Sequence, residues 1–161
     1  MPLLIDQKVV ADDHWVRVDD TEQLAQLGNN PAILAWELFS QQRDELLAAD
    51  GELAVAIPND LDVVELEPLL ERLSVVAVDF PSFADGRAFS QARLLRRAGF
   101  KGQIRASGDV TWDRLRFMHR CGIDAMEIAE DRFTPEMLGA FGEISVNNQG
   151  AEDDPRPIYR Q

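Results

Sequence analysis

Short apolar runs alternate with helical patterns along the chain from residue 33 onward. The runs of strand length are the start of Ile33–Leu38, which continues as a helix through Ala49, then Leu53–Ile57, Val75–Asp79, Gln103–Ala106 and Asp124–Ile128. Helical patterns cover Val64–Leu73, interrupted by Pro68, then Gly86–Ala98, Thr111–Cys121 and Thr134–Phe141. This alternation predicts an α/β fold with a mostly parallel sheet of repeated βα units, joined by right-handed crossovers.

The segments on either side of this pattern are more polar. We expect residues 1–30 to form an N-terminal extension packed on the body, with a short strand at His14–Val18 and a turn at Gly28–Pro31. Residues 31–144 form the predicted α/β domain. Residues 145–161, rich in Asn, Asp, Glu and Pro, form a predicted flexible acidic tail.

Five or so strands fit two architectures, an open doubly wound sheet and a partial (β/α) barrel. A complete barrel of eight units needs about 200 residues or more, and the chain has 161. A homodimer that completes a partial barrel is a further alternative. With 45% hydrophobic residues, the chain can bury a single substantial core.

Composition indicates the cellular compartment of the protein. The single cysteine, Cys121, cannot form an internal disulfide, which favours a reducing compartment. The first residues lack a basic segment followed by a long apolar one, and no apolar run reaches the roughly 20 residues that span a bilayer. We therefore expect a soluble cytoplasmic protein with no membrane contact.

The charge is unevenly distributed. The net charge of −13 argues against nucleic acid as a partner. Residues 79–120 nevertheless carry nine basic and four acidic side chains, so this segment is +5 and the remainder −18. Eight of the nine cations are arginines, whose planar guanidinium matches carboxylates and oxyanions. They form either a solvated helix face or a site for an anion or an acidic partner.

Two predicted strand ends suggest an anion site. Ligands of parallel sheets bind at the carboxyl ends of the strands, and the loops Asp85-Gly86-Arg87 and Ser107-Gly108-Asp109 each lead into a helix. A helix N-terminus favours an anion, and Arg87 and Arg105 flank the two turns. In the structural interpretation, Asp85 caps one helix, Asp109 or Thr111 caps the other, and the glycines only form turns.

Other kinds of site have weaker support. The two histidines, His14 and His119, lie in no nucleophile motif, and His119 and Cys121 point in different directions on one helix, against a zinc site. Dinucleotide and phosphate-binding glycine motifs are absent from the sequence. Four carboxylates could gather at the carboxyl end of the predicted sheet for metal or acid–base chemistry. In so acidic a chain, coincidence explains their positions better. They are Asp60, Asp79, Asp109 and Glu130. We expect no metal and no cofactor.

Three motifs resemble a known family. The stretch from Phe83 to Arg93 follows the pattern F-x-D-G-R-x-x-S-x-A-R, residues 102–113 follow G-x-x-R-A-x-G-D-V-x-x-D, and residues 120–125 follow R-C-G-x-D-A. In these motifs the chain is similar to the bacterial Domain of Unknown Function 934 family. The resemblance covers about residues 75–128 and extends more loosely to residue 33. It implies association with assimilatory sulfite reduction, and members are often labelled oxidoreductases, although this sequence shows no redox cofactor motif.

The motif residues coincide with the two turns that we identified above from their position at the strand ends. They complete the candidate oxyanion site, which comprises Asp85, Gly86, Arg87, Ser90, Arg105, Gly108 and Asp109. The candidate partner-binding residues are Arg93, Arg96, Arg97 and Arg120.

Two hypotheses about function follow from these residues and from the resemblance. The first is an accessory protein of sulfite reduction that binds an acidic partner, such as sulfite reductase or its electron donor. The second is an enzyme or binding protein for a small oxyanion or phosphorylated ligand.

Overall fold

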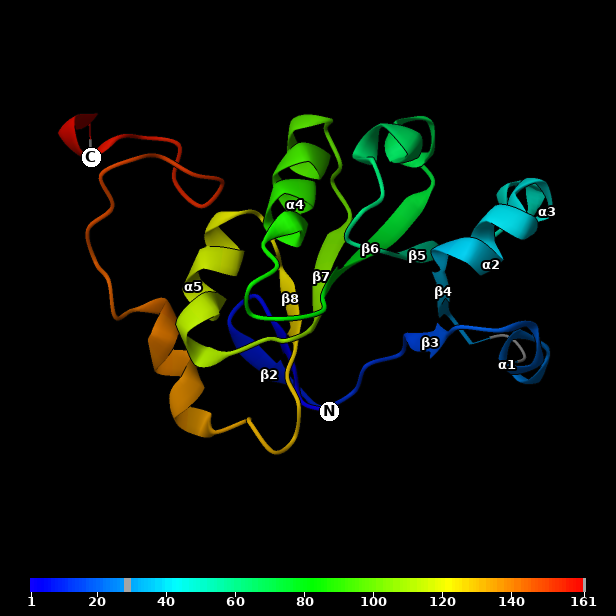
Figure 1. The fold of residues 1–161 in the computed structure, drawn as a ribbon, viewed down its shortest axis with the longest axis horizontal. Helices are drawn as coiled ribbons and strands as arrows, with labels where there is room; N and C mark the ends of the chain where they lie inside the picture. Colours follow the sequence, from blue (N-terminus) through cyan, green and yellow to red (C-terminus); the bar gives the residue numbers. More distant parts are fainter. Residues whose placement is uncertain (28–29, 161) are drawn as a thin grey trace.

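The computed structural model describes residues 1–27 and 30–160, and one mixed sheet runs through it (Figure 1). Its strands are β1 (Leu3–Ile5), β2 (Lys8–Val10), β3 (Val16–Val18), β4 (Ala32–Ala35), β5 (Leu53–Ile57), β6 (Leu73–Phe80), β7 (Gln103–Gly108) and β8 (Ala125–Glu127). The α-helices are α1 (Thr21–Gln26), α2 (Trp36–Gln41), α3 (Arg43–Ala48), α4 (Arg87–Arg97) and α5 (Trp112–Arg120). The described residues also form the 3₁₀ helices η1 (Val63–Leu69), η2 (Pro135–Phe141) and η3 (Ile158–Arg160).

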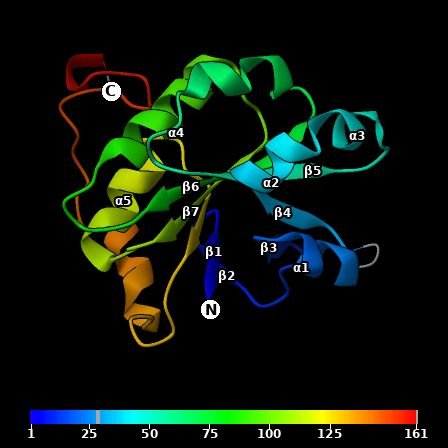
Figure 2. The same ribbon diagram turned by 45° about the vertical axis from the view of Figure 1, so that its right-hand side comes forward.

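The strand order distinguishes between the two predicted architectures. The order is β2-β1-β8-β7-β6-β5-β4-β3, so β3 to β8 follow one another as parallel neighbours. A doubly wound sheet reverses its strand order at a switch point, whereas this sheet always adds the next strand on the same side. The fold is therefore a curled half-barrel, and its helices lie along the convex side (Figure 2).

The connection from β2 to β3 shows why the sheet must curl. These strands are the two edges of the sheet, seven strand spacings apart, which would be about 34 Å in a flat sheet. Only six Cα steps separate Val10 from Val16, and an extended chain covers about 22 Å in that distance. Residues 11–15, which we call the strap, therefore cross the open side of the half-barrel.

The N-terminal residues are more regular than the sequence predicts. Asp6 and Gln7 both have positive φ angles, 48° and 65°, as a two-residue hairpin turn requires. This hairpin of β1 and β2 pairs antiparallel with β8. Residues 16–26 supply β3 and α1, and β3 lies within the predicted strand at His14–Val18. Residues 28 and 29 of the predicted turn at Gly28–Pro31 lie outside the described residues.

The two faces of the sheet carry different cores. On the helix side, Leu95, Ile104, Leu115 and Met118 are fully buried in one large apolar cluster. The concave face holds a small cluster of Ile33, Ala54, Ala56, Val75 and Ala77, covered by Trp15 of the strap. Within the described part of the chain, no helix is both long and apolar enough to cross a membrane.

Most predicted element boundaries agree with the structure to within one to three residues. β5 has the predicted bounds, and α4 and α5 lie inside the predicted helices. The segments 63–69 and 135–141 form 3₁₀ helices, and Pro68 stands inside the first of them. A proline without an N–H and with a fixed φ angle explains why a regular α-helix does not form there.

Candidate functional site

The first predicted anion-binding turn contains an ion pair. Asp85 and Arg87 lie where the β6–α4 loop enters α4, and the Arg87 Nη2 donates to the Asp85 Oδ2 at 2.7 Å. Asp85 also accepts the backbone N–H of Arg87 at 3.1 Å and the side-chain amide of Asn59 at 2.7 Å. These hydrogen bonds from Arg87 lower the pKa of Asp85 to about 2. The Arg87 guanidinium therefore already has an anionic partner, and Ser90 is exposed one turn further along α4.

The second turn holds a carboxylate between two arginines. Asp109 accepts from Arg114 at 3.4 Å and from Arg132 at 2.5 Å. The buried Arg114 guanidinium also lies over the rings of Phe80 and Phe89. The N-cap position of α5 is Thr111, and no side chain caps this helix, so neither Asp109 nor Thr111 is the expected cap.

Gly108 ends β7 with a φ angle of +87°. A Cβ atom at this position would overlap the carbonyl oxygen of Phe80. This glycine is required for the close approach of the β7–α5 loop to β6. Gly86 differs, since it has an ordinary negative φ angle and serves as the N-cap position of α4.

Arg105 lies on the concave face of the sheet, away from Arg87. Its side chain is 1% exposed, and its Nη1 pairs with Asp13 of the strap at 2.6 Å and with Glu127 of β8 at 3.4 Å. Gln103 accepts two further hydrogen bonds from it. Burial raises the pKa of Asp13, but the hydrogen bonds from Arg105 and from the Trp15 N–H outweigh it and leave that pKa below its usual value.

The predicted oxyanion site is therefore divided between different parts of the molecule. Asp85, Gly86, Arg87 and Ser90 lie together at the start of α4, whereas Arg105 is held under the strap. Each of the two arginines proposed to clamp an anion has its own carboxylate partners. The structure does not bring Arg87 and Arg105 together around one ligand.

A row of polar side chains on the concave face lies near the carboxyl ends of the strands, where (β/α) barrels bind their ligands. The register places Ser107 of β7 beside Asp79 of β6, and Glu127 lies two residues after Ala125, the partner of Arg105. The Ser107 hydroxyl is buried and has no hydrogen-bond partner. Alternation along β7, with Ile104 and Ala106 facing the other side, is the signal that could have identified this row.

The arginines of α4 and α5 divide into internal and surface groups. Arg96 donates to the carbonyls of Phe100, Gly102 and Gly122 and pairs with Asp124. Four acceptors hold this guanidinium inside the fold, so we remove Arg96 from the candidate partner surface. Arg97 is exposed beside Leu94, where α4 faces Asp62 and Glu67 at η1, and Leu94 is 44% exposed.

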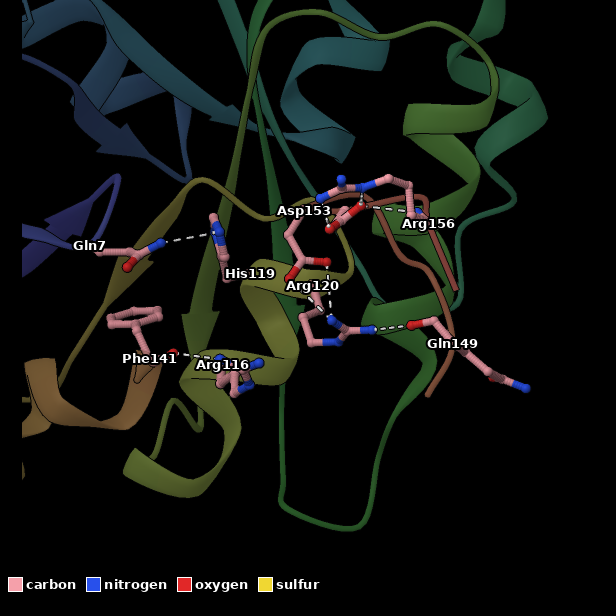
Figure 3. A network of polar contacts seen from close by, with 9 residues as sticks. Gln7, Arg116, His119, Arg120, Phe141, Gln149, Asp153 and Arg156 are labelled. Atoms are coloured by element: carbon pink, nitrogen blue, oxygen red, sulfur yellow. Dashed lines mark hydrogen bonds and ion pairs between the residues drawn. The ribbon is translucent and has the colours of Figure 1, made fainter. Parts of the chain in front are cut away.

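Arg93 and Arg120 contact the C-terminal segment. The Arg93 Nη1 lies 2.8 Å from Glu152, and the Arg120 Nη1 lies 3.1 Å from Asp153. Arg120 also donates to the carbonyl of Gln149 at 2.8 Å, and its guanidinium lies between Gln149 and Asp153 in Figure 3. The acidic carboxylates were visible in the sequence, but no local pattern indicated which arginines they would meet.

The remaining candidate groups are occupied or buried. His119 hydrogen-bonds the Gln7 amide at 3.2 Å (Figure 3). Cys121 is buried, and this burial raises the pKa of its thiol, which disfavours the reactive thiolate. Among residues 1–27 and 30–160, no three His, Cys, Asp or Glu side chains are grouped to hold a metal ion.

Comparison with known proteins identifies one family, which matches the chain from β5 to η3. A family model described as bacterial protein of unknown function (DUF934) matches residues 54–159, about two thirds of the chain. None of the curated proteins compared with the chain matches it. The match includes α4, α5 and the C-terminal segment that contacts them.

Proposed function

The chain belongs to the DUF934 family of bacterial proteins, and we propose that it is an accessory protein that binds an acidic protein partner through α4 and α5. The binding surface consists of Arg93, Arg97 and Arg120, together with Leu94 and Phe117. The motifs shared with the family suggest assimilatory sulfite reduction as the setting, with sulfite reductase or its electron donor as the partner.

One observation carries this proposal. In a chain with a net charge of −13, arginines of two neighbouring helices gather on one surface and already bind two carboxylates, those of Glu152 and Asp153. A surface that accepts carboxylates within its own chain has the right chemistry for an acidic partner.

Exposed apolar side chains on the same helices support an interface. Leu94 on α4 is 44% exposed and Phe117 on α5 is 55% exposed. Aromatic residues and arginine are enriched in protein interfaces, where they supply the anchoring contacts. Exposed arginines and exposed apolar side chains on two neighbouring helices are typical of a protein-binding region.

A small-oxyanion enzyme has less support. Such a site needs a cation with a free donor at the strand ends. Arg87, Arg105 and Arg114 each already have a carboxylate partner. The unpaired Ser107 hydroxyl lies next to carboxylates rather than next to a free cation.

The affinity for purified assimilatory sulfite reductase and for its electron donor tests the proposal. Arg97→Glu changes an exposed arginine and should weaken binding about tenfold, because interface charges steer association. Arg43→Glu makes the same reversal on α3, outside the surface, and serves as the matched control. Binding should also fall when the salt concentration rises from 50 to 200 mM. Affinity that is insensitive to both salt and Arg97→Glu would show that the surface is not used.

A further inference from the structure

The C-terminal segment folds into a loop of its own beside α4 and α5. The Ala151 N–H donates to the Asp154 carbonyl at 2.8 Å, and the Ile158 N–H reaches the Asn148 carbonyl at 3.4 Å. Arg156 pairs with Asp154 at 2.8 Å. We call residues 148–158 the acidic loop. It runs along the outside of α5 and α4 in both ribbon views (Figures 1 and 2).

The acidic loop contacts the arginine surface through backbone as well as side chains. The Glu152 N–H donates to the Arg120 carbonyl at 3.1 Å, and Arg120 donates back to the Gln149 carbonyl at 2.8 Å. Glu152 and Asp153 then place their carboxylates on Arg93 and Arg120. Successive residues are thus recognised in a fixed register, rather than by loose attraction between charges.

A glycine allows this close approach. Gly122 follows α5 with a φ angle of +91°. A Cβ atom there would lie 3.2 Å from the Glu152 Cγ and 2.7 Å from the Arg96 Cγ. The absence of a side chain at Gly122 therefore leaves room for the Glu152 side chain against the end of α5.

The contacts suit a reversible complex. The Arg93 and Glu152 side chains are 40% and 35% exposed, so this pair stays in contact with water, whereas Arg120 and Asp153 are 13% and 20% exposed. Ion pairs that remain in contact with water contribute little net stability, so the loop can be exchanged for another acidic segment.

We propose that Arg93, Arg120 and the end of α5 form a recognition site for an extended acidic segment of the partner, and that the acidic loop occupies this site until the partner displaces it. This inference rests on the proposed function, since it supposes an acidic partner. It adds the kind of segment recognised: two adjacent carboxylate residues that follow small residues, as Gly150 and Ala151 precede Glu152 and Asp153.

A peptide with the sequence of residues 147–160 is the probe, labelled with fluorescein. Its anisotropy is measured against the full chain, the full chain with Glu152→Gln and Asp153→Asn together, and the full chain with Asp44→Asn and Glu45→Gln together. The last variant is the matched control, because it removes two adjacent exposed carboxylates from α3 rather than from the acidic loop. All four changes keep the side-chain size.

The expected result follows from competition. A tethered segment has an effective concentration of about 1 mM, so for a peptide with a dissociation constant of about 0.1 mM the attached loop lowers the apparent affinity about tenfold. The Glu152→Gln and Asp153→Asn double variant should therefore bind the peptide about tenfold more tightly than the wild type, and the α3 control variant should bind it like the wild type. A peptide with Gln and Asn at the two acidic positions should not bind.

Equal affinity of wild type and double variant would overturn the proposal, as would equal binding of the neutral peptide. This assay contains no partner protein. If the expected peptide result is not seen, the acidic-loop site is overturned, even if sulfite reductase binds through Arg97. Arg97 does not contact the loop in the hydrogen bonds and ion pairs described. A failed reductase interaction together with the expected peptide result would instead overturn only the proposed function.

Discussion

Replacing Arg105 with methionine should destabilise the protein through the strap that closes the half-barrel. The guanidinium is 1% exposed and holds Asp13 at 2.6 Å and Glu127 at 3.4 Å. Methionine keeps the apolar stem but leaves two carboxylates without their cation. Removing one partner of a buried ion pair costs about 3–5 kcal/mol. Because Asp13 and Glu127 remain 29% and 20% exposed, we expect the lower end, about 3 kcal/mol.

Urea unfolding followed by circular dichroism measures this loss, and thermal unfolding should show a Tm lower by about 6–12 °C. Arg17→Met is the matched control, since the Arg17–Asp19 pair is exposed and such pairs contribute about 0–1 kcal/mol. Asp13→Asn should restore part of the stability in the Arg105→Met background by removing one unpaired carboxylate. A loss below about 1 kcal/mol, equal to that of Arg17→Met, would refute this role of the strap.

Three further predictions concern single positions. Gly108→Ala should destabilise the protein by about 2 kcal/mol or more in urea unfolding, whereas Gly99→Ala, also at positive φ but facing open space, should cost about 1 kcal/mol; equal losses would contradict the clash with Phe80. The pKa of Asp85 is about 2, below its ordinary value of 3.8, so its stabilisation is present above about pH 4 and lost as the pH falls toward 2. The stability difference between wild type and Asp85→Asn should therefore shrink over that range, and a constant difference would contradict the ion pair with Arg87. The Cys121 thiol, whose pKa burial raises, should react with a thiol reagent at pH 8 at least tenfold more slowly in the native than in the unfolded protein; equal rates would contradict its burial.

The sequence was sufficient for the βα units because each carries its own periodic signal. The predicted strand at Leu53–Ile57 and the helix around Arg87–Arg97 depend on local apolar spacing, which the structure preserves. The three-residue strands β1 and β2 are too short for a period of two to be visible. The choice between half-barrel and doubly wound sheet depends on which strands become neighbours, and no local pattern specifies that.

The candidate site was predictable only in part, for a similar reason. The two glycine turns were identified by their position at the strand ends, and both lie there. The partners of the arginines could not be identified, because Arg105 meets Asp13 across 92 residues and Arg93 meets Glu152 across 59. Charge counts show that 29 acidic side chains surround 16 basic ones, whereas the choice of partner for each arginine depends on the completed sheet.

Oxidative footprinting of the chain, alone and bound to sulfite reductase, tests most directly whether α4 and α5 form the partner surface. Leu94 and Phe117 are 44% and 55% exposed, and Val16, on the edge strand β3, is 44% exposed and provides the internal reference. The account predicts that oxidation of Leu94 and Phe117 falls severalfold in the complex while that of Val16 does not change. Protection of Val16 with no protection of Leu94 and Phe117 would contradict it.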